Sequence, residues 1–208
     1  MYKKIIKTIF VVFLGIIIYF VALPSYSYGR YSPVEGDIVF QSLPKMDLVV
    51  AIEGVTHSPY SHVGLVIQKE DKWYVREAIG GVLDTPLYQW ILRGRKGGID
   101  VYRLKNEYHE DIPQLIKETE KYMGLPYDVK YAMDDEKIYC SELIYKAYRD
   151  ATGKKMGKLV ALGTMNWKPY QETIEYYEEG PIPLERKMIT PRHLSESIYL
   201  QKVLSVNM

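Results

Sequence analysis

Cys140 is the residue with the clearest chemical potential, and it is the only cysteine among the 208 residues of the chain. A single cysteine cannot form a disulfide within its own chain, so it is either a small buried apolar residue or a reactive thiol. Its surroundings favour the thiol, because an apolar stripe with helical spacing starts at this position and contains Cys140, Leu143, Ile144, Ala147, Tyr148 and Ala151. Glu142 suits the first turn of such a helix, and Gly153 is placed to end it. Cys140 therefore stands at a helix N-terminus, where the helix dipole favours the thiolate that attacks acyl carbons.

A cysteine nucleophile also needs an imidazole as general base and ion-pair partner. The chain has four histidines, which are His57, His62, His109 and His193. The first precedes a Ser-Pro turn, the third lies in a charged connector, and the fourth suits the surface of a last helix. His62 instead begins the predicted strand 62–68, and Gly64 shares its face and leaves room for a helix end to approach. We predict that His62 is the base; the alternative is a core histidine bonded to a backbone carbonyl.

Glu77 is the predicted third member of this site. It shares one face of the predicted strand 73–79 with a tryptophan, a valine and an isoleucine, and a carboxylate in such a row requires a partner. A turn at 69–72 that pairs Gln68 with Trp73 makes Glu77 the diagonal neighbour of His62, about 7–8 Å away between backbones. A two-residue turn at Lys69-Glu70 would place the two residues directly opposite. Both registers give a nucleophile, a base and an orienting acid; the alternative is a surface glutamate on an edge strand.

Residues beside this pair are candidates for substrate binding. Tyr60, Ser61 and Tyr139 flank His62 and Cys140 in the chain, and we expect them to line the cleft. Tyr60 is also a candidate second oxyanion donor. We predict no metal and no cofactor, because the histidines lack metal-site spacing and the chain has neither a phosphate loop nor a dinucleotide fingerprint. The pairs Gly80-Gly81 and Gly97-Gly98 are interpreted as turns.

The N-terminus has the pattern of a secretory signal. Three lysines precede the uncharged stretch Thr8–Leu23, which Pro24 is expected to break, and Ser25 and Ser27 have the small-residue spacing of a cleavage site. We predict a signal peptide over 1–27 and an exported domain over 28–208. An uncleaved membrane anchor is the second choice, because sixteen residues fall short of the roughly 20 that span a bilayer. Cleavage leaves 24 basic and 26 acidic residues, a balance that argues against a nucleic-acid partner.

Other patterns indicate alternating strands and helices in one domain without repeats. Strands are expected over 37–41, 62–68, 73–79 and 99–104, and helices over 46–54, 86–92, 111–123 and from 140 to Gly153. Asp111 is placed to cap the third helix, and Gly124 to end it. Thr190-Pro191 has the pattern of a helix start, which predicts a last helix over 193–200.

Several of these segments resemble the circularly permuted branch of the NlpC-type papain-like superfamily, the YaeF/YiiX-like branch. They are Gly36-Asp37-Ile38-Val39-Phe40, Ser61-His62-Val63-Gly64-Leu65-Val66, Gly124-Leu125-Pro126-Tyr127-Asp128, Tyr139-Cys140-Ser141-Glu142-Leu143 and Thr190-Pro191. Unpermuted relatives have the cysteine helix first, whereas here it follows the Gly-Asp and His-Val-Gly strands. The resemblance implies a papain-like α+β fold, with an antiparallel sheet packed against the helix that carries Cys140.

The same resemblance implies a cysteine hydrolase with Cys140 as nucleophile, His62 as base and Glu77 as third polar residue. Relatives cleave peptide bonds of bacterial cell-wall stems, while permuted relatives include enzymes that act on lipid acyl groups. We therefore expect an exported amidase or endopeptidase of cell-wall peptides. The alternatives are a lipid-directed acyl hydrolase or acyltransferase with the same site, and a non-catalytic module that binds wall fragments or lipids. A membrane partner is expected only through an uncleaved N-terminal segment.

Overall fold

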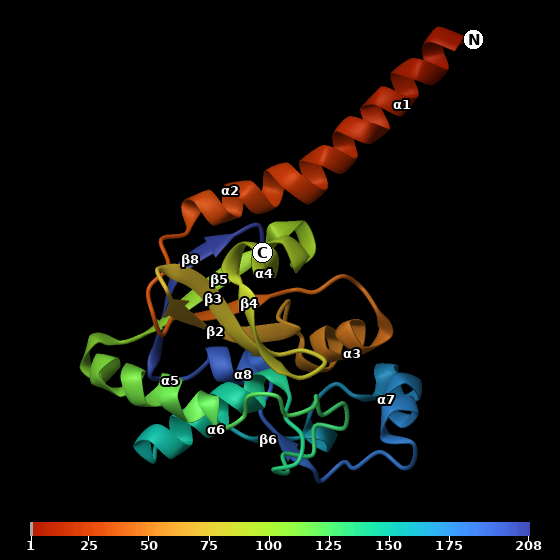
Figure 1. Cartoon of the computed structure of the whole chain (residues 1–208). Helices are drawn as coiled ribbons and strands as arrows, with labels where there is room; N and C mark the ends of the chain where they lie inside the picture. Colours follow the sequence, from red (N-terminus) through yellow and green to blue (C-terminus); the bar gives the residue numbers. More distant parts are fainter. Residues whose placement is uncertain (1) are drawn as a thin grey trace.

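A six-stranded antiparallel sheet forms the centre of the molecule, with strand order β4-β3-β2-β1-β5-β8 (Figure 1). The computed structural model describes residues 2–208, with side-chain surroundings for 4–17 and 19–208. The strands are β1 (Ile38–Gln41), β2 (His62–Lys69), β3 (Lys72–Ala78), β4 (Val82–Pro86), β5 (Ile99–Leu104) and β8 (Leu200–Val206). The short strands β6 (Val160–Ala161) and β7 (Lys187–Met188) pair separately. The predicted α+β fold with an antiparallel sheet is confirmed.

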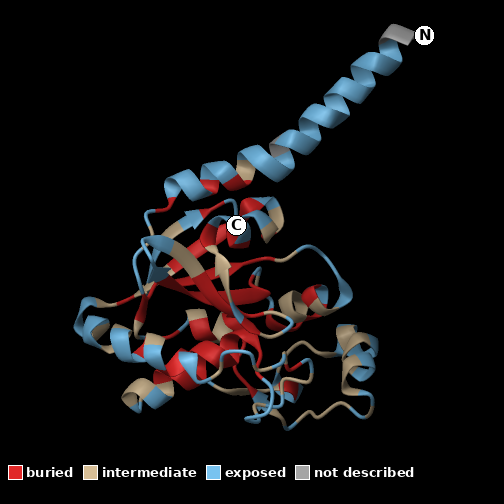
Figure 2. Ribbon diagram, viewed as in Figure 1, coloured by how far each residue is buried: buried red, intermediate tan, exposed pale blue. Residues whose placement is uncertain are grey.

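The helices cover both faces of this sheet. On one face, α4 (Leu87–Arg93) packs on a core that includes Val39, Val66 and Val75. On the other face, α6 (Cys140–Thr152) and α8 (Pro191–Ser195) pack on residues that alternate with these, including Ile38 and Leu65, and α5 (Ile112–Glu120) lies beside α6. The helices α3 (Asp47–Thr56) and α7 (Gln171–Glu178) lie together at one side of the domain. The buried sheet therefore separates two apolar cores (Figure 2).

Most predicted elements are confirmed, including the helix that starts at Cys140 and ends at Gly153, whose φ is 72°. The predicted helix over 193–200 is wrong. Thr190 does cap a helix, accepting a hydrogen bond from the His193 N–H, but that helix ends at Ser195. The chain then enters β8, which pairs with the otherwise open edge of β5. Backbone groups along an open strand edge need partners, and this pairing outweighs the local helical pattern.

The hairpin of β2 and β3 sets the spacing of the candidate site. Gln68 pairs with Trp73, which is the first of the two registers considered, and the alternative turn at Lys69-Glu70 is wrong. The turn is shorter than predicted, because only Glu70 and Asp71 lie outside the paired residues, with φ of 48° and 60°. Two positive φ values in a two-residue turn match the right-handed twist of the flanking strands.

The N-terminal segment is helical through the position where a break was expected. α1 (Tyr2–Ile17) continues through a π-helical turn, η1 (Ile18–Ala22), into α2 (Leu23–Arg30). Pro24 lies in the first turn of α2, where the missing N–H of proline does little harm. The helix Lys4–Arg30 contains an 18-residue window with a mean hydropathy of 2.6. Met1 of the predicted signal, and the side chain of Lys3 in its basic start, lie outside what the structure describes.

Gly64 is required by the packing of the sheet next to the candidate site. A Cβ atom at this position would lie 2.3 Å from Val75 Cγ1 and 3.1 Å from the Arg76 carbonyl oxygen. We predict that Gly64→Ala lowers the free energy of unfolding by about 1–3 kcal/mol, measured by urea denaturation. Gly180→Ala is the matched control, because a Cβ there meets no atom within 4 Å, and it should stay within about 0.5 kcal/mol. Equal stability of the two variants would contradict the prediction.

Candidate active site

The start of α6 is held in place by hydrogen bonds on both sides of Cys140. Glu142 Oε2 accepts a hydrogen bond from the Tyr139 N–H at 3.2 Å, which caps the helix. The Tyr139 hydroxyl accepts from the Ile189 N–H at 3.1 Å, and the Ser141 hydroxyl donates to the Ile189 carbonyl at 3.0 Å. Cys140 is only 2% exposed. The thiol therefore has a defined position at a helix N-terminus.

His62 and Glu77 form a buried pair on the sheet. His62 Nε2 lies 2.5 Å from Glu77 Oε2, and the two residues are 2% and 0% exposed. The sulfur of Cys140 is the other group near the imidazole, and it contributes to the raised pKa of His62. Because Nε2 is engaged by the carboxylate, Nδ1 is the nitrogen left for that sulfur. The structure thus brings together the three residues that were predicted as catalytic.

Glu77 has two further partners, which the sequence did not reveal. The Thr85 hydroxyl on β4 donates to Glu77 Oε1 at 2.5 Å, and the Arg93 guanidinium on α4 forms an ion pair with Oε2. Strand β4 was not predicted, and nothing local distinguishes Arg93 from other basic residues at helix ends. The side chain of Trp90, also on α4, packs beside His62 with ring centroids 6.2 Å apart. These contacts fix both the orientation and the charge of the pair.

The ionisation of the pair is set by these contacts. Burial alone would lower the pKa of His62, but its hydrogen bonds with Cys140 and Glu77 and their charges raise that pKa to about 9. Burial would raise the pKa of Glu77, but the hydrogen bond and charge of His62 and the charge of Arg93 hold it at about 2. Around neutral pH the favoured state is therefore an imidazolium paired with a carboxylate.

The residues predicted to bind substrate have polar groups that are engaged elsewhere. The Tyr60 hydroxyl donates to Asp100 and also contacts Tyr102 and Lys202, so it is not placed as a free oxyanion donor. The Ser61 hydroxyl accepts from the Leu43 N–H at 2.9 Å, and the Tyr139 hydroxyl is bonded to Ile189. All three residues are at most 7% exposed. Their hydroxyls support the site from within the domain, and the expectation that these residues line a cleft stays a prediction.

Two tyrosines of the 124–138 connection lie close to the nucleophile instead. The hydroxyls of Tyr127 and Tyr131 are 3.1 Å apart, and the Tyr131 ring packs on Tyr139 at 4.6 Å between centroids. Burial and the proximity of Cys140 raise the pKa of both hydroxyls, so they remain neutral hydrogen-bond donors. Tyr127 belongs to the Gly-Leu-Pro-Tyr-Asp segment that carried part of the family resemblance, which was the available signal for this role.

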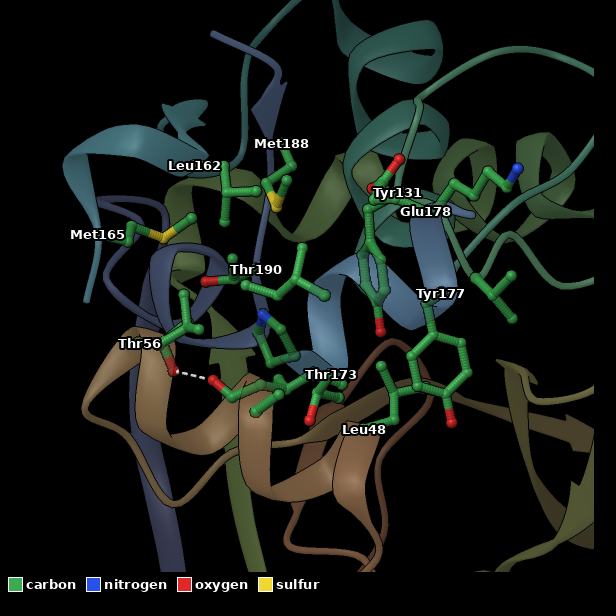
Figure 3. Close-up of a pocket in the computed structure, with 17 residues that line it drawn as sticks. Leu48, Thr56, Tyr131, Leu162, Met165, Thr173, Tyr177, Glu178, Met188 and Thr190 are labelled. Carbon is green, nitrogen blue, oxygen red and sulfur yellow. Dashed lines mark hydrogen bonds between the residues drawn. The ribbon is translucent and has the colours of Figure 1, made fainter. Parts of the chain in front are cut away.

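An apolar pocket lies next to this tyrosine pair (Figure 3). It encloses about 620 Å³, counting space open to solvent, between α3 and α7. Its lining includes Ala51, Val55, Leu162, Ile174, Met188 and Tyr131. Tyr131 connects the pocket to the surroundings of Cys140, and the segment from Met188 to Pro191 is bonded to the start of α6 through Ile189. Tyr131 therefore links the pocket to the neighbourhood of the candidate nucleophile.

Comparison with known proteins agrees with this arrangement. Residues 32–204 match the family described as the permuted papain-like amidase enzyme, YaeF/YiiX, C92 family. The chain belongs to this family. It is 33% identical over 186 residues to the uncharacterized protein YiiX of Escherichia coli strain K12, covering 88% of this chain and 90% of that protein. The crystal structure of the metalloprotein YiiX from Escherichia coli O157:H7 superposes with a TM-score of 0.79 at 34% identity, covering 84% of this chain and 98% of that one.

Family membership makes the protein a papain-like cysteine hydrolase, as the sequence had indicated. The permuted order is also confirmed, because the strand with His62 precedes the helix with Cys140. The Escherichia coli O157:H7 protein is described as a metalloprotein. Within residues 2–208, no three His, Cys, Asp or Glu side chains come together as a possible metal site. We therefore derive no step through a metal.

The raised pKa of His62 predicts a specific pH dependence of stability. A group with a raised pKa in the folded state stabilises the fold fully below its unfolded pKa, near 6.5, and this contribution is lost as pH rises through about 9. The free energy of unfolding of the wild type should therefore fall between pH 6.5 and 10 by up to about 3 kcal/mol more than that of His62→Gln. Urea denaturation at several pH values measures the difference. Parallel curves for the two proteins would refute the ion pair.

Proposed function

We propose that this protein is an exported cysteine amidase that cleaves peptide bonds of the cell wall through Cys140, His62 and Glu77. The observation that carries the proposal is the continuous buried series from the sulfur through the imidazole to the carboxylate. Burial of a carboxylate requires polar partners that compensate for the lost hydration. Such buried, paired charges cluster at functional sites. The series also has the order that a nucleophile, a base and an orienting acid require.

The positions of these groups support the following steps for the first half of the reaction. The Cys140 thiolate attacks the carbonyl carbon of the substrate, and a C–S bond forms as the carbonyl electrons move to oxygen. The N–H groups in the first turn of α6 have no partner within the helix and stabilise the oxyanion. The hydroxyls of Tyr127 and Tyr131 bond to each other, so one of the two O–H groups is left as a further donor near the sulfur. The His62 imidazolium then transfers its Nδ1 proton to the leaving nitrogen, and the C–N bond breaks.

The second half returns the enzyme to its starting state. His62, now neutral, accepts a proton from water as the water oxygen attacks the thioester carbon. Collapse of this intermediate breaks the C–S bond, releases the carboxylic acid and restores the thiolate and imidazolium pair. Glu77 keeps its charge throughout and holds the imidazole in the orientation that presents Nδ1 to the sulfur.

The apolar N-terminal helix supports the extracytoplasmic location in this proposal, because basic residues before an apolar segment favour export of the domain on its C-terminal side. Outside the cytoplasm of a bacterium, wall stem peptides are abundant amide substrates.

The pocket beside Tyr131 favours a second candidate function, hydrolysis of an amide or ester that carries an acyl chain. Its lining is almost entirely apolar, whereas wall stems are rich in charged groups. A non-catalytic binding module is the remaining alternative, and turnover of either substrate excludes it.

The role of the three residues is tested by a thiol-reactive acylating probe and by variants. Cys140 should be labelled faster in the folded protein than in urea at neutral pH, because the helix end and His62 stabilise the thiolate. Cys140→Ala should remove turnover while keeping the fold.

Glu77→Gln should lower kcat/KM by about 10²- to 10⁴-fold, yet less than His62→Ala, since the helix end still favours the thiolate. Glu110→Gln, an exposed carboxylate outside the site, is the control; full activity of Glu77→Gln would leave a dyad of Cys140 and His62.

The two candidate substrates are separated by changing the pocket. Ile174→Gln introduces a polar side chain into the pocket lining, and Ile198→Gln makes the same change at a residue that is 71% exposed. If the substrate carries an acyl chain, Ile174→Gln should raise KM for a long-chain N-acyl amide about tenfold, with little effect on a short-chain analogue. If the substrate is a wall peptide, the wild type should cleave purified stem peptides and leave the long-chain amide intact. Kinetics of the wild type and both variants on the two substrates decide between the candidates.

A further inference from the structure

The helix α2 is packed onto the folded domain, although it contains the predicted cleavage site. Ser27 is fully buried, and its hydroxyl accepts a hydrogen bond from Asn207 Nδ2 at 3.0 Å. Pro24 is buried against Gly97 of the 3₁₀ turn η2 (Arg95–Gly97), where a Cβ on the glycine would lie 2.5 Å from Pro24 Cα. Residues from the middle and from the C-terminal end of the domain sequence thus complete their packing only with α2 present.

Aromatic contacts extend this interface along α4. The rings of Tyr28 and Tyr88 meet edge to face with centroids 5.4 Å apart, and the Ser25 and Tyr88 hydroxyls lie 3.3 Å apart. Beyond the helix, the buried Tyr31 donates a hydrogen bond to Asp37 at 2.8 Å, at the start of the sheet. The chain is therefore ordered without a gap from α2 into β1, and no flexible linker separates the helix from the domain.

The preceding helix has the opposite character. The described side chains of α1 and η1 are exposed and almost all apolar, for example Ile9 at 62% and Phe10 at 64% (Figure 2). The 21 residues Tyr2–Ala22 span about 32 Å at 1.5 Å per residue, close to the thickness of the hydrocarbon core of a bilayer. This length includes the first turns of α1, which the uncharged stretch from Thr8 leaves out. Lys4 and Lys7 lie in these turns, from which their long side chains reach the lipid headgroups.

We propose that the N-terminal helix is retained as a membrane anchor, with α1 and η1 in a lipid bilayer and α2 docked on α4 at the membrane surface. Cleavage after Ser27 would require an accessible, extended backbone, whereas Ser27 is helical and buried. Cleavage would also expose the surfaces of α4, η2 and Asn207 that α2 covers. The partner that accounts for the remaining apolar surface of α1 is the hydrocarbon of a membrane.

Docking through α2 also fixes the orientation of the domain. α2 lies on the α4 side of the sheet, whereas α6 and Cys140 belong to the core on the opposite face (Figure 1). The sheet therefore lies between the bilayer and the nucleophile. A bilayer lipid would therefore have to leave the membrane to approach Cys140.

Retention is tested on the full chain expressed in a bacterial host. Membranes are washed with alkaline carbonate, and the intact mass of the protein is measured in the pellet and in the soluble fraction. We expect the chain with its N-terminal helix in the carbonate-resistant pellet. A soluble species that consists of residues 28–208 would overturn the proposal. The result does not depend on turnover, so it is separable from the proposed chemistry.

Docking is tested by hydrogen exchange of the purified full chain in detergent micelles. Ser27→Leu places a larger side chain in the buried contact, while Tyr26→Leu changes a neighbour that is 57% exposed. Amides of α2 should exchange at least tenfold faster in Ser27→Leu than in Tyr26→Leu, while amides of α6 remain unchanged in both. Equal and rapid exchange of α2 in the wild type and both variants would contradict docking.

Orientation is tested in liposomes with single fluorescent labels on introduced cysteines, in a Cys140→Ala background. Leu92→Cys lies on α4 and Tyr176→Cys on α7, and both positions are exposed, at 39% and 76%. A quencher attached to lipid headgroups should quench the label at position 92 several-fold more than the label at position 176. Equal quenching, or stronger quenching at position 176, would rule out the proposed orientation.

Discussion

The charge of Glu77 is the constraint on which the site depends. Its carboxylate has no contact with solvent, and an unpaired buried charge would destabilise the fold by several kcal/mol. Its charge is balanced by His62 from β2 and Arg93 from α4, and Thr85 from β4 donates a hydrogen bond to it. The carboxylate is therefore paired only when both hairpins have the correct register and α4 is correctly placed. The pairing of His62 with Glu77 thus depends on the folding of the whole sheet.

The two faces of the sheet contribute different things to the chemistry. The face toward α4 holds the ion pairs that fix the orientation and charge of the imidazole. The face toward α6 is an extended apolar core that fixes the helix with Cys140. His62 is the first residue of β2, and Cys140 is the first residue of α6. The imidazole and the sulfur therefore come from different layers of the domain, and they lie close together where the start of α6 meets the sheet.

Helix α4 links this chemistry to the N-terminal segment. Its inner face carries Trp90 beside His62 and ends at Arg93, which is paired with Glu77. Its outer face receives α2 through Tyr88. Because side chains at helix interfaces are closely packed, the position of α2 contributes to the stability of α4, whose Arg93 is paired with Glu77. The family match begins at residue 32, so α2 lies outside the residues that the family model matches.

The features that the sequence determined by itself depend on local periodicity. The apolar stripe behind Cys140 and the alternation along 62–68 and 73–79 place the thiol at a helix start and Glu77 diagonal to His62, because side-chain direction depends on backbone type. Tertiary structure decided the matters that involve a choice among distant partners. Arg93 was one of many basic residues until α4 folded over Glu77, and Tyr60 was a plausible oxyanion donor until Asp100 and Lys202 engaged its hydroxyl. Strand β8 and the continuation of the helix through Pro24 were likewise decided by an open sheet edge and by the surface of α4, neither of which exists in the unfolded chain.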